Sequence, residues 1–367
     1  MQGAAALELG RDAFARRAWE DAFVHLSTAD RDLSLEPDDI ERLATAAYLT
    51  ARDVESDEAW TRAHHAHQER GDAVRAARAA FWLGFQLMPK GDFARAGGWF
   101  ARAKRLLDEG GHDCPEQGLV MVPMGAQSLF GGDAAGALAI FEQAADIGKR
   151  FNHRDLLTLS AFGRGQALIA LGRVSEGIAV LDEAMVAVTA GEVSIVIAGV
   201  VYCGVIATCC DLFDMGRARE WTAALTAWCE TQPDLVPFRG QCLVHRAQVM
   251  QFRGAWAEAL EEAERARARL SAPLLPAVGL AFYQLGELHR LRGASGKAEE
   301  AYRQAGETGH SPQPGLALLR LAQGKTDAAR AGVGRALEEA REPAARSRIL
   351  PAVVEIELAV GDINRAG

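Results

Sequence analysis

Residues 203–270 read CGVIATCCDLFDMGRAREWTAALTAWCETQPDLVPFRGQCLVHRAQVMQFRGAWAEALEEAERARARL, and this stretch decides the fold class. A helical pattern turns at Phe213 and then resumes. A loop bounded by Pro233 and Pro237 follows, and a second helical pattern turns at Gly254. Two helical hairpins in succession are the smallest sample of an α-solenoid.

The turn in each hairpin has one form, a residue that breaks the helix followed five positions later by a small residue. The same pair recurs along the whole chain, with breakers 31 to 41 residues apart and a mean spacing of about 38. A period of this length is typical of two-helix repeats and slightly exceeds that of the tetratricopeptide repeat. The pairs are Arg17/Ala22, Val54/Ala59, Gly91/Ala96, Gly132/Ala137, Gly172/Gly177, Phe213/Ala218, Gly254/Ala259, Gly293/Ala298, Gly324/Ala329 and Gly361/Ala366.

Mostly small residues also recur at two other places, which lets paired helices approach closely. Seven positions before the breaker lie Gly10, Ala47, Gly84, Gly125, Gly165, Ile206, Ala247, Gly286, Ala317 and Val354. Twelve positions after it lie Ala29, Ala66, Ala103, Ala144, Ala184, Leu225, Ala266, Ala305 and Ala336. The agreement predicts an all-α fold, a right-handed α-solenoid of tetratricopeptide-like helical hairpins. The alternative, an alanine-rich helical bundle, lacks a fixed period.

The repeats continue from end to end, which predicts a single superhelical domain over residues 1–367 with about nine and a half repeats. The final residues from Gly361 form the turn of a tenth hairpin without its second helix. We therefore expect about nineteen helices, two per repeat and one unpaired. A half repeat leaves an apolar face uncovered. Either the chain is cut from a longer protein or something else covers this end.

The composition argues against several functional classes. The chain has 40 Lys and Arg against 49 Asp and Glu, a net charge of −9, and no basic block, so we expect no direct binding of nucleic acid. It has no apolar run of about 18 residues and no amino-terminal signal peptide. We expect a cytoplasmic protein without membrane contact.

The chemistry-bearing residues form no recognisable catalytic or metal-binding motif. The six cysteines include no C-x-x-C pair, which favours free thiols in a reducing compartment over a disulfide framework or a zinc site. His64, His65 and His67 lie close together on one predicted helix and are interpreted as exposed histidines without further metal ligands. We expect neither an enzyme nor a cofactor.

Several segments resemble the helical-repeat part of actinobacterial LuxR-type transcriptional regulators. They are 42–48 (RLATAAY), 81–85 (FWLGF), 217–222 (RAREWT), 233–246 (PDLVPFRGQCLVHR), 281–290 (AFYQLGELHR) and 314–324 (PGLALLRLAQG). The resemblance spans nearly the whole chain. It implies a sensing or interaction module. In that family a helix-turn-helix DNA-binding domain follows at the carboxyl terminus, and this chain contains neither that domain nor an ATPase P-loop.

The repeat pattern also indicates a binding surface. In tetratricopeptide-like arrays the first helix of each hairpin lines the concave groove, with groove-facing positions 13, 10, 6, 3 and 2 residues before the breaker. In the middle repeats these positions are apolar and aromatic with a few amides, which is typical of a pocket for a small molecule or an apolar peptide. The alternative is that tight curvature buries these side chains against one another. The candidates are Phe81, Phe85, Phe130, Phe162, Gln166, Cys203, Gln241, Gln248, Phe252, Tyr283 and Glu287.

Two functional hypotheses follow. The first is the ligand- or partner-sensing module of a LuxR-type regulator, which binds a small-molecule or peptide effector, or a protein partner, in the groove. The second is a stand-alone repeat scaffold for protein–protein interaction. Either form is compatible with a homodimer.

Overall fold

The computed structural model describes residues 2–232, 239–271, 275, 277–340 and 343–366. Twenty α-helices and one short 3₁₀-helix, Met88–Lys90, lie in this part of the chain. The first ten are α1 (Gln2–Ala15), α2 (Trp19–Asp32), α3 (Pro37–Leu49), α4 (Asp53–Glu69), α5 (Ala73–Leu87), α6 (Phe93–Gly110), α7 (Pro115–Phe130), α8 (Ala134–Arg150), α9 (Arg154–Ala170) and α10 (Val174–Thr189). The others are α11 (Ile195–Asp211), α12 (Met215–Glu230), α13 (Arg239–Phe252), α14 (Trp256–Leu270), α15 (Val278–Leu291), α16 (Ser295–Glu307), α17 (Gly315–Ala322), α18 (Thr326–Glu339), α19 (Pro343–Val360) and α20 (Ile363–Ala366).

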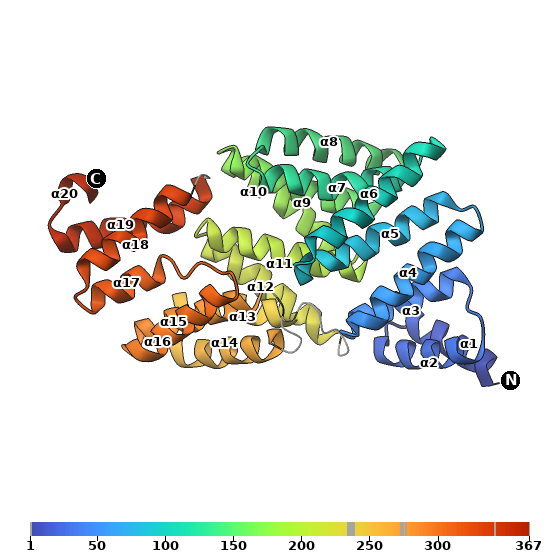
Figure 1. The fold of residues 1–367 in the computed structure, drawn as a ribbon, viewed down its shortest axis with the longest axis horizontal. Helices are drawn as coiled ribbons and strands as arrows, with labels where there is room; N and C mark the ends of the chain where they lie inside the picture. Colours follow the sequence, from blue (N-terminus) through green and yellow to red (C-terminus); the bar gives the residue numbers. More distant parts are fainter. Residues whose placement is uncertain (1, 233–238, 272–274, 276, 341–342, 367) are drawn as a thin grey trace. The chain divides into compact units, whose positions relative to one another are not determined.

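The helices form the predicted hairpins, and the all-α helical-repeat fold is confirmed. Odd-numbered helices are the first, or A, helix of each hairpin and even-numbered helices are the second, or B, helix. Figure 1 shows α1 beside α2 and α15 beside α16, pairs that are in close contact. None of the helices within the described ranges is long and apolar enough to cross a bilayer.

The turns have the local geometry that the breakers predict. Nine of the ten predicted breakers adopt positive φ. Seven of these nine are glycines, for which this backbone region carries little cost. Arg17 (φ 62°) and Phe213 (φ 57°) adopt it as well, although their side chains disfavour it. The hairpin geometry therefore holds even where glycine is absent.

The second turn was predicted three residues too late. Val54 lies inside α4, whereas the residue with positive φ is Ala51, at 59°. With Ala51 as the breaker, the small residues of this repeat become Ala44, Ser56 and Ala63, all fully buried. Ser56 Oγ donates to the Ala44 carbonyl oxygen at 2.8 Å, which ties the two helices at their closest approach. No glycine or proline marks this turn, so the misplacement has a clear cause.

The small residue seven positions before the breaker makes room for a large residue nine positions after it. A Cβ added at Gly84 would lie 2.8 Å from Phe100 Cε1, and one at Gly286 would lie 2.5 Å from Tyr302 Cε1. Such distances are too short for real side chains, so these glycines permit the aromatic rings to pack. In these two hairpins a glycine on the A helix thus faces a large aromatic residue on the B helix.

The chain divides into two compact units. Unit 1 comprises residues 1–167, 180–201 and 226–239, and unit 2 comprises 168–179, 202–225 and 240–367. In unit 1 the apolar core runs from Ala6 through Leu26 and Leu83 to Ala96. In unit 2 separate clusters lie around α13–α15 and α17–α19.

The last hairpin also differs from its prediction. The second helix of the tenth repeat begins as α20, a four-residue helix after the turn at Gly361. The count is therefore twenty α-helices in the described residues rather than nineteen. On α19, Leu350, Val354 and Leu358 are between 37% and 53% exposed and follow one another at intervals of four. These residues form a partly exposed apolar stripe along α19.

Candidate functional site

The predicted groove residues of unit 1 have dissimilar surroundings. Phe81 is buried and packs its ring 5.6 Å from that of Phe85, whereas Phe130 at the end of α7 is 80% exposed. Phe162 and Gln166 on α9 are half-buried. Phe81 is therefore part of the hairpin core as well as an A-helix residue.

The predicted residues of unit 2 are also divided between core and surface. Cys203 is buried, while Phe252 is 57% exposed. Gln248 Oε1 accepts a hydrogen bond at 3.2 Å from the Nδ1 of His245. The side chain of Gln241 lies outside the described residues. A common binding centre for the eleven predicted residues stays a prediction.

Tyr283 and Glu287 belong to a polar cluster on α15, α16 and the segment before α17. Tyr302 of α16 donates its hydroxyl hydrogen to Glu287, and Arg290 Nη2 donates to Glu287 Oε2 at 2.8 Å. The rings of Tyr283 and Tyr302 lie 5.8 Å apart, and that of His310 lies 5.4 Å from Tyr283. The side chains of Glu287 and Arg290 are only 13% and 18% exposed.

The cluster is closed by the start of α17. A Cβ added at Gly315 would lie 2.1 Å from Glu287 Oε1, so this backbone approaches the carboxylate directly. Burial raises the pKa of Tyr302, and the neighbouring Glu287 charge adds to that effect. Burial likewise raises the pKa of Tyr283. Both phenols remain protonated hydrogen-bond donors at neutral pH.

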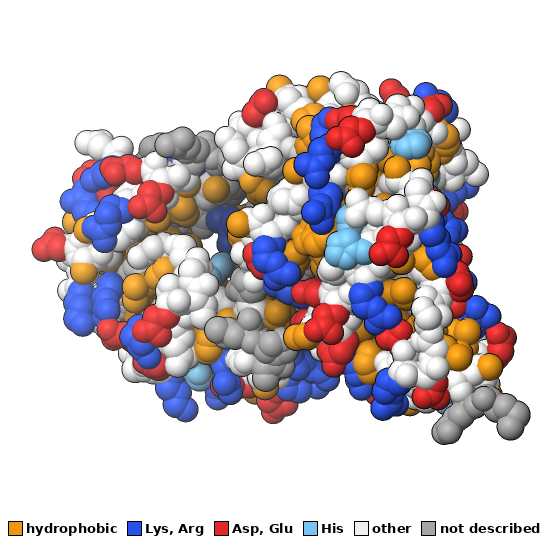
Figure 2. Space-filling model, turned by 45° about the vertical axis from the view of Figure 1, so that its right-hand side comes forward, with side chains coloured by type: hydrophobic (Ala, Val, Ile, Leu, Met, Phe, Trp, Pro, Cys, Tyr) orange, Lys and Arg blue, Asp and Glu red, His pale blue; other side chains and the backbone are white. Residues whose placement is uncertain are grey.

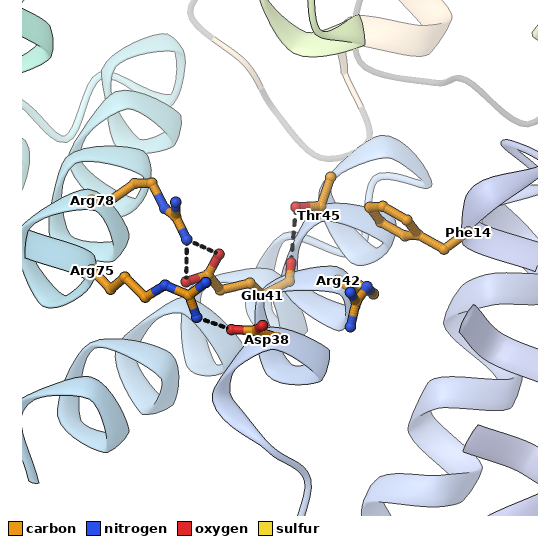
Figure 3. Close-up of a pocket in the computed structure, with 7 residues that line it drawn as sticks. All are labelled: Phe14, Asp38, Glu41, Arg42, Thr45, Arg75 and Arg78. Carbon is orange, nitrogen blue, oxygen red and sulfur yellow. Dashed lines mark hydrogen bonds and ion pairs between the residues drawn. The ribbon is translucent and has the colours of Figure 1, made fainter. Parts of the chain in front are cut away.

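A second arrangement lies in unit 1, where α1, α3 and α5 enclose a pocket of about 270 Å³. We name it the arginine pocket. Figure 3 shows Arg75 and Arg78 reaching from α5 toward Asp38 and Glu41 of α3, with Phe14 of α1 opposite. All the helices that line the pocket are A helices. The lining residues are Phe14, Asp38, Glu41, Arg42, Thr45, Arg75 and Arg78.

Asp39 holds two arginines at the edge of this pocket. Its side chain is 1% exposed and accepts from Arg11 Nε at 2.9 Å and from Arg42 Nη1 at 2.6 Å. Burial raises the pKa of Asp39, but the hydrogen bonds from Arg11 and Arg42 outweigh it and hold the pKa below 3.8. The hydrogen bond to Asp39 also raises the pKa of Arg11. The Asp39 carboxylate and the Arg11 guanidinium are therefore charged at neutral pH.

Glu41 of α3 likewise holds an arginine of the pocket, Arg78 of α5. Its carboxylate is 15% exposed and accepts from Arg78 Nη2 at 2.9 and 3.1 Å. His67 of α4, itself 2% exposed, contributes Nε2 at 2.8 Å from Glu41 Oε1. Arg75 is paired with Asp38 at the mouth, where both side chains are more than 40% exposed.

His64 and His67 are buried, which corrects their interpretation as exposed residues. His64 Nδ1 lies 2.8 Å from the Ala76 carbonyl oxygen, and burial lowers the pKa of His64. Both histidines connect α4 to a neighbouring A helix. Within the described residues, no three His, Cys, Asp or Glu side chains gather as a metal site would require.

The misplaced second turn hid part of the arginine pocket from sequence reasoning. Relative to Ala51, residues Asp38, Glu41 and Thr45 lie 13, 10 and 6 positions before the breaker, where groove-facing residues are expected. Relative to Val54, only Glu41 occupies such a position. The acids Asp38, Asp39 and Glu41 at the start of α3 were the signal available in the sequence.

A further pocket of about 420 Å³ lies in unit 2 among α14, α15 and α16. Phe282 and Leu285 contribute apolar surface, and Arg267, His289 and Lys297 contribute polar groups. Two B helices line it, so it does not belong to the face formed by A helices alone. On the face drawn in Figure 2, basic and acidic side chains of the described residues alternate.

Comparison with solved structures finds helical proteins of low identity. The apo form of RapI matches with a TM-score of 0.45 and 12% identity, covering 84% of this chain and all of that one. A Rap protein complexed with competence and sporulation factor matches with 0.42 and 12%, covering 99% and 94%. A chain of the APC/C hetero-tetramer Cut9–Hcn1 matches with a TM-score of 0.39 and 12% identity, covering 100% of this chain and 77% of that one.

No protein-family model matches the chain, and a comparison with curated proteins finds no match.

Proposed function

We propose that this chain is the sensing module of a LuxR-type transcriptional regulator and binds a small-molecule or peptide effector on its A-helix face. The resemblance of several segments to the helical-repeat part of those regulators supports the link to transcription. In this proposal the chain itself makes no contact with a promoter, since its net charge is −9.

The observation that carries the proposal is the arginine pocket. It is lined only by A helices, and Asp38, Glu41 and Thr45 occupy positions that face the groove in repeats of this kind. Its polar groups converge from helices separated in sequence, while Phe14 supplies an aromatic wall. A concave site with a few convergent polar groups and an apolar side is the usual form of a ligand site.

Unit 2 supplies a second place where an effector can contact the A-helix face. Tyr283 and Glu287 lie on α15, and Phe252 at the end of α13 exposes its ring. If an effector contacts this region, Tyr283→Ala should weaken its binding by about 1–3 kcal/mol. A stand-alone scaffold that holds a protein partner through the same face is the second candidate function.

A blocking variant tests the binding part of the proposal. Thr45 is half-buried at the pocket, so Thr45→Phe places a ring in the space where a ligand would lie. The immobilised chain is used to select binders from a random heptapeptide display library. In a separate assay, a set of metabolites is screened by the shift that each causes in the thermal unfolding of the chain in solution. At a hundred times its dissociation constant a ligand adds about 2.7 kcal/mol of stability. Binders that prefer the wild type over Thr45→Phe support the proposal, and equal binding contradicts it.

Transcript profiling separates the sensor from the scaffold. The gene is deleted in its host and complemented with the wild type or Thr45→Phe, each checked for normal helical content by circular dichroism. A sensor predicts a defined set of transcripts that only the wild type restores. A scaffold predicts loss of a captured protein partner in Thr45→Phe without such a set.

A further inference from the structure

We propose that the arginine pocket recognises a carboxylate group, either on a small organic acid or on an acidic side chain of a peptide. This inference rests on the proposed function, because it names the chemical class of ligand bound at the same site. It follows from how the arginines are held, from which of their donors remain, and from the balance of charge.

Two of the three arginines, Arg42 and Arg78, are held by carboxylates that are less exposed than they are. Asp39 is 1% exposed, whereas the Arg42 side chain that it holds is 36% exposed. Glu41 is 15% exposed, and Arg78 is 30% exposed. Each guanidinium is thus anchored at one edge and open at another. Groups that are already oriented bind a ligand with a smaller loss of side-chain freedom.

Donors remain for a ligand after these contacts are made. Within the described part of the chain, Arg42 donates only through Nη1 and Arg78 only through Nη2. Arg42 therefore has Nε and Nη2 left, and Arg78 has Nε and Nη1. The planar guanidinium fork matches the two oxygens of a carboxylate and forms paired hydrogen bonds with it.

The charge balance favours a monoanion. Three arginines and two carboxylates, Asp38 and Glu41, line the pocket, so the lining carries a net charge of +1. One carboxylate neutralises this charge. A phosphate dianion would exceed it and leave the pocket with a net charge of −1. A volume of about 270 Å³ also fits a short acidic side chain or small acid rather than a larger cofactor.

The test titrates the full chain by calorimetry with four probes. These are a glutamate-rich hexapeptide, the same peptide with glutamine in place of glutamate, free glutarate and inorganic phosphate. We expect the glutamate peptide or glutarate to bind, the glutamine peptide to bind at least ten times more weakly, and phosphate to compete poorly. The stronger of the two carboxylate probes identifies the source of the ligand group.

Three variants locate the site. Arg42→Gln leaves Arg11 on Asp39, and Arg78→Gln leaves His67 on Glu41, so neither strands a buried carboxylate. Each is expected to weaken carboxylate binding at least tenfold. Arg95→Gln is the matched control, since Arg95 on α6 is 60% exposed, pairs with Asp92 and lies outside the pocket. It should bind as the wild type does, and all three should keep their unfolding midpoints within a few degrees.

Several results would overturn the inference. They are tighter binding of phosphate, equal binding of the glutamine peptide, unchanged affinity in Arg42→Gln and Arg78→Gln, or no binding of any probe. The proposed function survives separately if a library-selected ligand is blocked by Thr45→Phe yet is unaffected by the two glutamine variants. That outcome would place an uncharged effector in the same pocket.

Discussion

The arginine pocket of unit 1 and the Glu287 cluster of unit 2 use the same residue types in opposite ways. In both, A-helix arginines pair with carboxylates. Around Glu287, the arginine and the carboxylate are both less than a fifth exposed, and Tyr302 and the backbone at Gly315 complete the enclosure. Around Asp39, only the carboxylate is hidden, and Arg42 is 36% exposed.

The difference teaches that exposure of the arginine, rather than its presence, separates a ligand site from a packing network. A buried pair uses its donors internally and stabilises the hairpin only while it is complete. An arginine that is anchored on one side and open on the other retains donors for a ligand. We therefore expect mutation of Glu287 to affect mainly stability, and mutation of Arg42 or Arg78 to affect mainly binding.

The largest effect is expected for Glu287→Ala. This change leaves the Tyr302 hydroxyl and the Arg290 guanidinium without their buried partner, which costs about 3 kcal/mol of unfolding free energy. Chemical denaturation monitored by circular dichroism measures it. Glu287→Gln, which keeps an acceptor for Tyr302, should lose less. Wild-type stability in Glu287→Ala would remove the contrast between the two regions.

Overpacking the two units at equivalent positions tests whether they share one scaffold. Ala103 in unit 1 and Ala266 in unit 2 lie twelve residues after their breakers, and both are fully buried. Ala103→Leu and Ala266→Leu should each lower the unfolding free energy by roughly 1–3 kcal/mol, because the added atoms force paired helices apart. Similar losses in the two variants would indicate that the units share the same helix packing and differ in their polar side chains. Unchanged denaturation midpoints would show that the repeat positions are wrong.

The loss of unfolding free energy in Asp39→Asn should be smaller, and it should depend on pH. The pKa of Asp39 is lower in the folded chain than its ordinary value, so its contribution is present above about pH 4 and is lost as pH falls through the folded pKa. At pH 7 the variant should lose about 1.5 kcal/mol through weaker hydrogen bonds to two arginines. Unfolding measured from pH 7 to pH 3 should fall less steeply in the variant. Parallel curves would indicate that Asp39 does not hold the arginines.

The smallest stability effect is expected for Arg78→Gln. Arg78 is partly exposed, and Glu41 keeps His67 as a partner, so the loss should be about 0.5 kcal/mol. Thermal unfolding at several salt concentrations measures it. A loss as large as that of Glu287→Ala would mean that the arginine pocket is also a packing network. The two regions would then not differ in how their arginines are used.

The sequence by itself determined the period, the hairpins and nine of the ten turns. Glycines at positive φ and the fully buried Ala22, Ala96 and Ala298 act within one hairpin, so their spacing is visible along the chain. The second turn escaped because Ala51 adopts a backbone conformation that alanine rarely takes, held there by the surrounding helices.

Only the tertiary structure decided which polar side chains form a site. Arg11 is 28 residues from Asp39, and Arg78 is 37 residues from Glu41, so neither pair has a signature in the local pattern. Their contact depends on how one hairpin packs on the next, and a shift of three residues in one turn changes which face of α3 meets the groove. Exposure, which separates Arg42 from Arg290, is likewise a property of the packed helices rather than of the residues themselves.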